Sequence, residues 1–241
     1  MKIEKFDSVE STNKYCEALD LAEVEDFTCF WTLEQTAGIG QQGNRWHAEP
    51  GKNLTFSLVI HPVFLPADRQ FQLTECLSLA LVDFLSIFNF HSSVSIKWPN
   101  DIYVAGKKIC GTLVSTHLQG HRIASAICGI GININQTAFP DWIPNPTSLT
   151  LLTGKEFDLE PLMHQLLECI RNRYNDLRID RNLEAEYLSH LLNLNTPAHY
   201  RYRDEVITAT ITGVDSYGRL LLTVDDGRHL VCDMKSIGRM E

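Results

Sequence analysis

The sequence predicts an α+β fold in which helices flank a mixed, mainly antiparallel sheet and a small all-β unit follows at the C-terminal end. β-rich segments linked by tight turns fill residues 94–135, which favours an antiparallel meander over βαβ units. Residues 70–88 and 159–177 repeat apolar side chains at steps of three and four, which is typical of helices. After residue 195 the apolar period changes to two, as in short strands.

The composition is that of an ordinary globular protein, and it excludes several classes of function. A chain of 241 residues can bury a full core. The formal net charge of −9 argues against a nucleic-acid-binding surface spread over the protein, so we expect no DNA binding. A local basic pocket for a phosphorylated small molecule stays compatible with that charge. The most apolar stretch, residues 73–90, is interrupted by polar side chains, so we expect no membrane span.

Cysteine usage and the N-terminus bear on the compartment. Seven cysteines are scattered without a C-x-x-C pair, which supports neither a zinc site nor a dithiol motif. Most have apolar neighbours, as buried reduced thiols do. The first residues contain no apolar signal segment. We therefore expect a cytoplasmic location.

The first sixty residues are predicted to form three strands and one helix. Ser8 and Ser11 both have side chains suited to cap that helix. The expected bounds are residues 3–6, 28–33 and 54–60 for the strands and residues 13–21 for the helix.

A glycine-rich stretch, residues 35–53, lies between the second and third of these strands. Its Gly38, Gly40 and Gly43 spell G-x-G-x-x-G, the pattern of dinucleotide-binding turns. Such a turn needs a helix that begins inside the motif and faces the pyrophosphate. Here a β-rich run follows instead, so the sequence predicts a long loop between two strands. The alternative to a ligand-binding loop is a plain surface loop.

Residues 70–88 form the clearest helix, and its wide apolar stripe indicates a core element rather than a cofactor-binding surface. The meander after it is predicted to consist of strands at residues 94–97, 102–104, 108–118 and 122–135. A loop with three prolines covers residues 137–150. Two helices are expected after that loop, at residues 159–177, which Asp158 can cap, and at residues 183–192.

The C-terminal part of the chain is predicted to contain only strands. Their expected bounds are residues 200–211, 219–224 and 228–233. The Asp226-Gly227 dipeptide suits a tight turn between the last two. Short strands in a unit of this size are typical of a small barrel. We therefore predict two domains, residues 1–194 and residues 195–241.

The string Lys97-Trp98-Pro99-Asn100-Asp101 ends the first strand of the meander. Pro99 lacks a backbone donor, so the strand is expected to stop there and to present Asn100 and Asp101 at its tip. A carboxylate beside an amide can serve as a Mg²⁺ ligand together with phosphate oxygens, which makes Asp101 the candidate metal ligand. The alternative is an ordinary Asn-Asp turn.

Two further patterns in the meander suggest a ligand that lies against the sheet. Successive side chains of a strand point to opposite faces, so only one of Lys107 and Lys108 can face a site on that sheet. Gly111 would let a ligand lie flat on the same strand. Gly129 and Gly131 weaken a buried strand unless something approaches closely. The alternative explanation for this pair is close packing of the helix predicted at residues 70–88.

Together these motifs resemble the catalytic domain of the biotin–protein ligase family, and the resemblance covers essentially the whole chain. The matching motifs follow the family's order: Asp7-Ser8-x-x-Ser11-Thr12-Asn13, Gln35-Thr36-Ala37-Gly38-x-Gly40-x-x-Gly43-x-x-Trp46, Gly51-x-Asn53-Leu54, Lys97-Trp98-Pro99-Asn100-Asp101, Lys108-x-x-Gly111-x-Leu113 and Gly129-Ile130-Gly131-Ile132-Asn133. The resemblance implies a class II aminoacyl-tRNA synthetase-like catalytic domain and a C-terminal SH3-like β-barrel. It also implies the form of the family without an N-terminal DNA-binding domain.

The resemblance implies an ATP-dependent reaction in two steps. Biotin and MgATP give biotinyl-5′-adenylate, and a lysine of a biotin carboxyl carrier protein then takes the biotin. Lys108 matches the family's lysine at the biotin carboxylate and α-phosphate, and Asp101 matches a metal ligand or proton acceptor. The implied biotin-binding residues are Ser11, Thr12, Asn13, Gln35, Gly38, Gly111, Leu113, Gly129 and Ile130. The implied nucleotide-binding residues are Gly40, Gln41, Gly43, Trp46, Asn53, Lys97, Asn100 and Asn133.

One position departs from the family's pattern. The family usually has Arg or Lys where Ile39 stands and often a second Arg where Gln41 stands, so the loop has lost positive charge. Weaker retention of the adenylate is expected unless Arg45 compensates. The family's pairing of sheets also makes a homodimer compatible with this chain. The alternative function is a lipoate or octanoate–protein ligase or transferase, which shares the fold.

Overall fold

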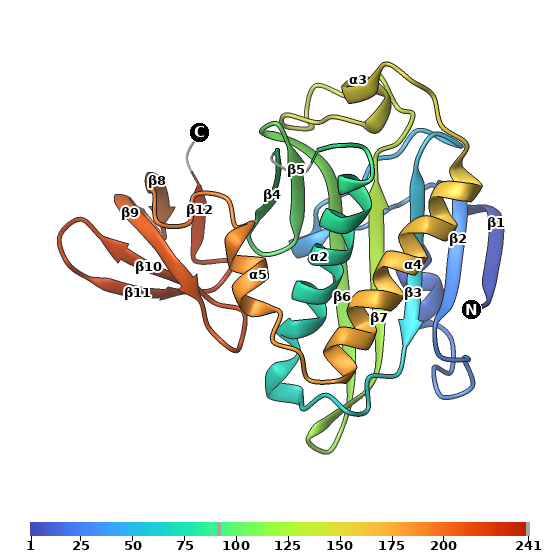
Figure 1. Ribbon diagram of the computed structural model, residues 1–241, viewed down its shortest axis with the longest axis horizontal. Coiled ribbons are helices and arrows are strands. Elements are labelled where there is room, and N and C mark those ends of the chain that lie inside the picture. Colours follow the sequence, from blue (N-terminus) through green and yellow to red (C-terminus); the bar gives the residue numbers. More distant parts are fainter. Residues whose placement is uncertain (91–92, 240–241) are drawn as a thin grey trace.

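The computed structural model describes residues 1–90 and 93–239, so the last two residues of the predicted C-terminal unit lie outside the described residues. The fold is α+β, as the sequence predicts, and Figure 1 labels its elements. The strands are β1 (Ile3–Val9), β2 (Thr28–Gln35), β3 (Leu54–Ile60), β4 (Val94–Lys97), β5 (Asp101–Val104), β6 (Lys107–Gln119), β7 (Arg122–Ile132), β8 (Pro197–Tyr202), β9 (Glu205–Val214), β10 (Leu220–Val224), β11 (His229–Cys232) and β12 (Ile237–Arg239). The helices are α1 (Thr12–Glu17), α2 (Phe71–Ser86), α3 (Leu149–Thr153), α4 (Leu159–Arg178) and α5 (Glu184–Ser189), with short 3₁₀ turns η1 (Gln41–Gly43) and η2 (Ala67–Arg69).

The strands form two sheets. The larger sheet has seven strands in the order β1-β2-β3-β7-β6-β5-β4, and the smaller has five in the order β11-β10-β9-β8-β12. The β1–β2 pair is parallel, whereas the pairs from β3 to β4 across the large sheet are antiparallel. The predicted meander is therefore confirmed as β4 to β7, because hairpins join strands that are neighbours in sequence.

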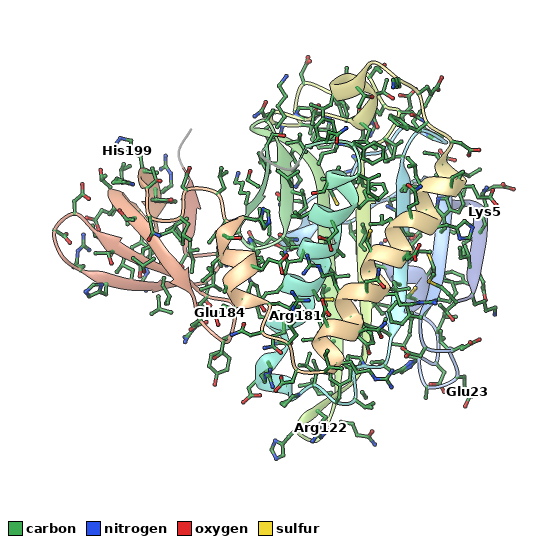
Figure 2. All side chains as sticks on the ribbon, in the orientation of Figure 1. Lys5, Glu23, Arg122, Arg181, Glu184 and His199 are labelled. Carbon is green, nitrogen blue, oxygen red and sulfur yellow. The ribbon has the colours of Figure 1, made fainter. Side chains whose placement is uncertain are left out.

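The two faces of the large sheet are covered differently. Helices α2 and α4 lie side by side over one face, and Figure 2 shows side chains filling the layer between them and the strands. Residues Phe56 and Leu58 of β3 alternate with Val59, which joins a separate cluster with Cys16 of α1 and Ile127. Since side chains alternate along a strand, α1 covers the opposite face from α2 and α4.

Local capping agrees with the sequence in part. Asp158 caps α4, because its carboxylate accepts from the Glu160 amide at 3.2 Å. Ser11 is the N-cap residue of α1, but its side chain makes no capping hydrogen bond. Helix α3 was not expected; it begins at the Ser148 cap and ends at Gly154, whose φ of 71° suits a glycine.

The C-terminal strands differ from the prediction in two respects. The strand expected at residues 200–211 is wrong, because Arg203 adopts a φ of 54° and turns the chain between β8 and β9. Strand β12 was not predicted, because it has three residues and an alternating apolar pattern cannot be recognised over so short a segment. The Asp226-Gly227 turn between β10 and β11 is confirmed, with Gly227 at a φ of 90°.

The small sheet packs against one end of the large one (Figure 1). The Trp98 indole donates to the Gly218 carbonyl at 3.0 Å, and Phe71 of α2 lies against the same glycine. Tyr200 and Leu222 of the small sheet belong to the same hydrophobic cluster as α2 and α4. The division at residue 195 stays a prediction, since the apolar core is continuous across it.

Among the helices of residues 1–90 and 93–239, none combines the length and the apolar character that a membrane span requires.

Candidate active site

A cavity of about 500 Å³ opens on the α1 face of the large sheet, where that sheet meets the small one. The first turn of α1, strands β5 to β7 and the glycine loop supply three of its walls. The fourth wall comes from the linker after α5 and from the small sheet, and was not predicted. Its residues are Leu192, Asn193, Tyr200, Ile211, Leu220, Met234, Ile237 and Gly238.

Glycines form the floor of this cavity. Gly131 pairs with Gly111, so this row of the β6–β7 pair presents no side chain, and Gly129 pairs with Leu113. A Cβ added to Gly129 would overlap the Asn13 side chain, and one added to Gly131 would overlap the Trp46 indole. The explanation by packing of the 70–88 helix is therefore wrong, because α2 covers the opposite face.

A chain of hydrogen bonds forms the polar end of the cavity. The Thr12 amide donates to Gln35 Oε1 at 2.8 Å, and the Thr12 hydroxyl lies 3.2 Å from the same atom. The Ser57 hydroxyl lies 2.7 Å from Thr12 Oγ1 and 2.6 Å from Asn13 Oδ1. The Asn13 amide reaches the Leu113 carbonyl at 3.5 Å. Thr12, Asn13 and Gln35 line the cavity and thus present both donors and acceptors to a ligand, whereas Ser57 has no exposed surface.

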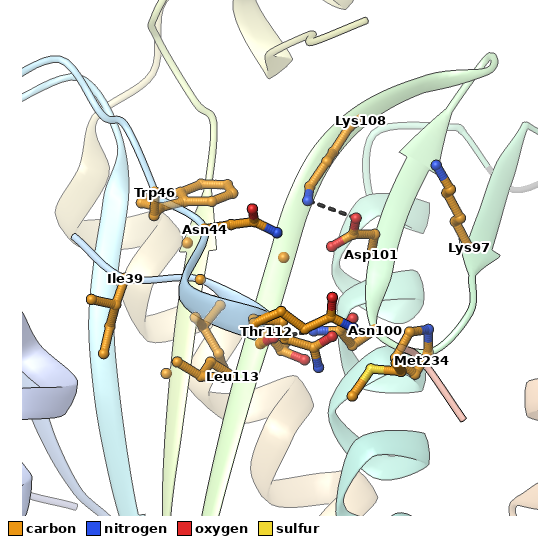
Figure 3. A pocket seen from close by; sticks show the side chains of 18 of the residues that line it. Ile39, Asn44, Trp46, Lys97, Asn100, Asp101, Lys108, Thr112, Leu113 and Met234 are labelled. Carbon is orange, nitrogen blue, oxygen red and sulfur yellow. Dashed lines mark hydrogen bonds and ion pairs between the residues drawn. The ribbon is translucent and has the colours of Figure 1, made fainter. Parts of the chain in front are cut away.

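Lys108 and Asp101 form an ion pair in the middle of the cavity, with 2.6 Å between Nζ and Oδ2. Figure 3 shows the two side chains facing each other between Trp46 and Lys97. Asp101 belongs to β5 and Lys108 to the neighbouring strand β6. In this pair of strands Tyr103 pairs with Lys108, and Ile102 pairs with Cys110. Both side chains are partly exposed to the cavity, so a charged ligand can contact them without rearrangement of the core.

The turn after β4 is anchored from three sides. The Asn100 amide donates to the Thr112 carbonyl, and the Tyr187 hydroxyl donates to the Pro99 carbonyl at 2.8 Å. The Trp98–Pro99 peptide is cis. Lys97 Nζ lies 3.4 Å from the Tyr103 hydroxyl. These contacts hold Asn100 beside Asp101 at the tip that the sequence predicted.

The glycine loop folds back on itself as a small hairpin. The Gly40 amide donates to the Asn44 carbonyl at 2.6 Å, and the Trp46 amide donates to the Gly38 carbonyl at 3.0 Å. Only the η1 turn separates the two arms, so the structure confirms a loop between two strands and not a strand–helix dinucleotide turn. The Trp46 ring lies over Gly131, with Lys108 Nζ 5.9 Å from its centre.

The structure brings most of the predicted site residues to this one cavity. Those that line it are Ser11, Thr12, Asn13, Gln35, Gly40, Gln41, Trp46, Lys97, Asn100, Asp101, Lys108, Gly111, Leu113, Gly129 and Ile130. Ile130 is a special case, because its side chain belongs to the core cluster on the far face of the sheet. It therefore contributes backbone rather than an apolar wall.

Four predicted residues lie outside the lining: Gly38, Gly43, Asn53 and Asn133. The Asn53 side chain is buried and bonds Gln136 at 2.6 Å and the Ile134 amide at 2.9 Å. The Asn133 amide donates to the Thr147 carbonyl at 3.0 Å. These two asparagines tie loops beneath the site together. Gly38 lies directly against the Trp46 backbone, where a Cβ would not fit.

Sequence reasoning missed Ser57, which links Thr12 to Asn13. A signal existed: Thr55 and Ser57 are alternate polar residues in an otherwise apolar strand, and alternation places both on the cavity face. The small-sheet wall had no such signal, because its side chains are ordinary apolar residues at strand spacing.

The cavity offers little to a resident metal ion. Asp101 is the one carboxylate in its lining, and within the described part of the chain no three His, Cys, Asp or Glu side chains gather as a metal site. Mg²⁺ readily binds through one or two carboxylates plus phosphate oxygens and water. The residues thus fit a Mg²⁺ ion that enters with a nucleotide, with Asp101 as its protein ligand.

The chain is similar in sequence to known ligases. Residues 5–133 match the model of the biotin/lipoate A/B protein ligase family. The bifunctional ligase/repressor BirA of Bacillus spizizenii is 31% identical over 226 residues, covering 92% of this chain and 69% of that protein. The biotin–[acetyl-CoA-carboxylase] ligase of Paracoccus denitrificans is 28% identical over 231 residues, covering 92% of this chain and 94% of that protein.

A solved structure agrees with these matches. The biotin protein ligase from Aquifex aeolicus, in complex with biotin and ATP, superposes with a TM-score of 0.80 and 25% identity over 99% of both chains. These are the two ligands that the family resemblance implies for this chain. The chain therefore belongs to the biotin/lipoate A/B protein ligase family, and the relatives it matches are biotin ligases.

Proposed function

We propose that this enzyme activates biotin as biotinyl-5′-AMP and transfers the biotin to a lysine of a biotin carboxyl carrier protein. The first step joins a biotin carboxylate oxygen to the α-phosphorus of ATP and releases pyrophosphate. In the second, the amine of the carrier lysine attacks the acyl carbon and AMP leaves. Both steps need a site where a carboxylate and a phosphate meet.

The Lys108–Asp101 pair supports this function by its position. It lies over Gly111 beside the Trp46 ring, in the cavity that Thr12 and Gly40 also line. A carboxylate and a triphosphate repel each other, so the first step requires a cation between them. Lys108 supplies that cation. In this proposal Asp101 would bind the Mg²⁺ of MgATP and, in the second step, would accept a proton from the carrier lysine.

The polar end of the cavity favours biotin over lipoate. The ureido ring of biotin has a carbonyl acceptor and two N–H donors, whereas the dithiolane ring of lipoate has no strong donor or acceptor. Thr12, Asn13, Gln35 and Ser57 form a hydrogen-bonded set, and the first three of them line the cavity. A ureido ring can form hydrogen bonds with these side chains that a dithiolane cannot, and each such bond contributes about 0.5–1.5 kcal/mol.

The glycine loop would close over the activated intermediate. A mixed anhydride is hydrolysed by water, so the enzyme must exclude solvent between the two steps. Gly40, Gln41 and Trp46 line the nucleotide side together with Lys97 and Asn100, and each is proposed to contact ATP or the adenylate.

ATP–pyrophosphate exchange measured separately with biotin, lipoate and octanoate tests the proposal. Exchange with biotin alone is expected, followed by biotinylation of an added carrier domain in intact-protein mass spectrometry. Exchange that requires lipoate, or biotin binding without exchange, would contradict it.

A further inference from the structure

The hairpin between Gly38 and Trp46 has one positively charged side chain, that of Arg45. Three cations line the cavity, and two of them already have partners. Lys108 is paired with Asp101 at 2.6 Å, and Lys97 lies 3.4 Å from the Tyr103 hydroxyl. Across residues 1–90 and 93–239 the Arg45 side chain forms no ion pair or hydrogen bond, although it lines the same cavity.

Arg45 lies directly opposite Ile39 in the hairpin. The two residues form an antiparallel bridge, and backbone hydrogen bonds close the hairpin on either side of it. Residues directly opposite in an antiparallel pair project from the same face, with Cβ atoms about 4.5–5.5 Å apart. Ile39 lines the cavity, so Arg45 is directed to the same wall.

The Trp46 side chain projects from the other face of the hairpin. Neighbouring residues in an extended arm alternate in direction, and the Trp46 ring is seated on Gly131. Figure 3 shows Ile39 and Trp46 projecting from the loop in different directions. The arrangement leaves the Arg45 guanidinium free of the indole, while its aliphatic stem can run along the Ile39 side chain.

The charge of the cavity gives this arginine a large effect. The charged lining residues are Arg45, Lys97, Lys108 and Asp101, which together carry a formal net charge of +2. Removing Arg45 would halve that charge. A triphosphate and a carboxylate together bring several negative charges, and a guanidinium can bind two phosphate oxygens at once.

We propose that Arg45 binds the phosphates of the nucleotide and of the acyl-adenylate, and so replaces from across the hairpin the cation that is absent at Ile39. The inference rests on the proposed function for the identity of the adenylate, but its nucleotide part stands on ATP binding alone. Arg45 is thus a phosphate-binding residue, and the Ile39 side chain packs against its aliphatic stem.

Three variants test the proposal: Arg45→Ala, the exchange Ile39→Arg with Arg45→Ile, and Arg178→Ala as control. Arg178 is an exposed arginine at the end of α4, outside the cavity. Calorimetry measures ATP binding, and stopped flow measures release of preformed biotinyl-adenylate. Since a hydrogen bond to a charged group is worth about ten- to a hundredfold in affinity, Arg45→Ala should weaken ATP binding and speed release by about that factor. The exchange variant should recover most of the loss.

ATP affinity in Arg45→Ala equal to that of wild type and Arg178→Ala would overturn the proposal. An exchange variant no better than Arg45→Ala would overturn the cross-hairpin replacement. If wild type binds ATP but forms no adenylate from biotin, the proposed function fails. The calorimetry on Arg45→Ala still decides the role of Arg45 in that case.

Discussion

Lys108 meets Asp101 because strand β6 contains one extra residue. Asp101 pairs with Gly111 and Ile102 with Cys110, but Tyr103 pairs with Lys108, so Ile109 has no partner on β5. In a regular strand, Lys108 and Gly111 would point to opposite faces, since they are three residues apart. The bulge turns Lys108 to the cavity face, where its ammonium lies 2.6 Å from the Asp101 carboxylate.

The bulge predicts which of two adjacent lysines is catalytic. Replacing Lys108 by Ala should lower the rate of biotin adenylation by about a thousandfold or more, because the cation between carboxylate and phosphate is lost. Lys107→Ala should change the rate by less than about threefold, because Lys107 is exposed. ATP–pyrophosphate exchange with biotin measures both. A large loss in Lys107→Ala with a mild effect in Lys108→Ala would mean that the register of β6 has been assigned wrongly.

A second prediction concerns the seat of the Trp46 ring. An alanine methyl at position 131 would occupy the space of the indole, so Gly131→Ala should displace Trp46 from the sheet. We expect a shift in tryptophan fluorescence and a loss of ATP affinity of about tenfold or more, as for the loss of a ring stacked on a base. Spectra and titrations of the apo and ATP-bound enzyme measure these effects.

Gly213→Ala is the matched control for that prediction. Gly213 is also a strand glycine without positive φ, and an added Cβ would lie 3.7 Å from Leu221, an ordinary contact. It should leave fluorescence and affinity unchanged. Unaltered fluorescence in Gly131→Ala would contradict the seating of the indole on this glycine.

The sequence predicted which residues line the cavity better than it predicted the contacts that bring them together. Helix α2 and the meander follow from apolar periodicity, and the Lys97–Asp101 string marks a strand end. Alternation alone could not choose between Lys107 and Lys108, because the bulge depends on how β5 and β7 pair with β6. Gly129 and Gly131 signalled a close approach, but not from which face.

The wall supplied by the small sheet escaped prediction for a different reason. Met234 and Tyr200 reach the cavity only because Trp98 and Phe71 dock the small sheet at this edge. Such contacts between segments distant in the chain leave no periodic pattern. Asn53 stands in a motif near the site, but it lies outside the cavity lining and its side-chain amide donates to Gln136.

Ser57 is expected to position the polar end of the cavity. It has no exposed surface and lies within 2.7 Å of both Thr12 Oγ1 and Asn13 Oδ1. Ser57→Ala would leave those two groups without this partner, at a cost of about 1–3 kcal/mol. We expect the KM for biotin to rise about tenfold, with kcat changed little and the KM for ATP unchanged.

Steady-state kinetics with each substrate varied in turn separates these effects. Ser125→Ala is the control, since Ser125 is also a buried strand serine outside the cavity lining but, within the described residues, makes no hydrogen bond to Thr12 or Asn13 as Ser57 does. Equal changes in the KM values for biotin and ATP would indicate general loosening of the site and contradict a role specific to the biotin end.

The last prediction concerns stability and a buried carboxyl on α2. Burial, with a smaller contribution from Glu184, raises the pKa of Glu75 to about 7, against an ordinary value of 4.5, and Arg69 opposes the rise only weakly. The folded protein therefore binds this proton more tightly than the unfolded chain does. The stabilising effect is fully present below about pH 4.5 and is lost as the pH rises through about 7. The two values correspond to roughly 3 kcal/mol by pH 8.

Glu75→Gln keeps the shape of the protonated side chain and removes its titration. Its free energy of unfolding should match that of wild type near pH 4 and exceed it at pH 8 by up to about 3 kcal/mol. Urea unfolding across this range measures the difference. Glu168→Gln, on the exposed side of α4, should show no such divergence. Parallel pH profiles for wild type and Glu75→Gln would mean that Glu75 is ionised in the folded protein, and that Arg69 offsets its burial more strongly than the geometry indicates.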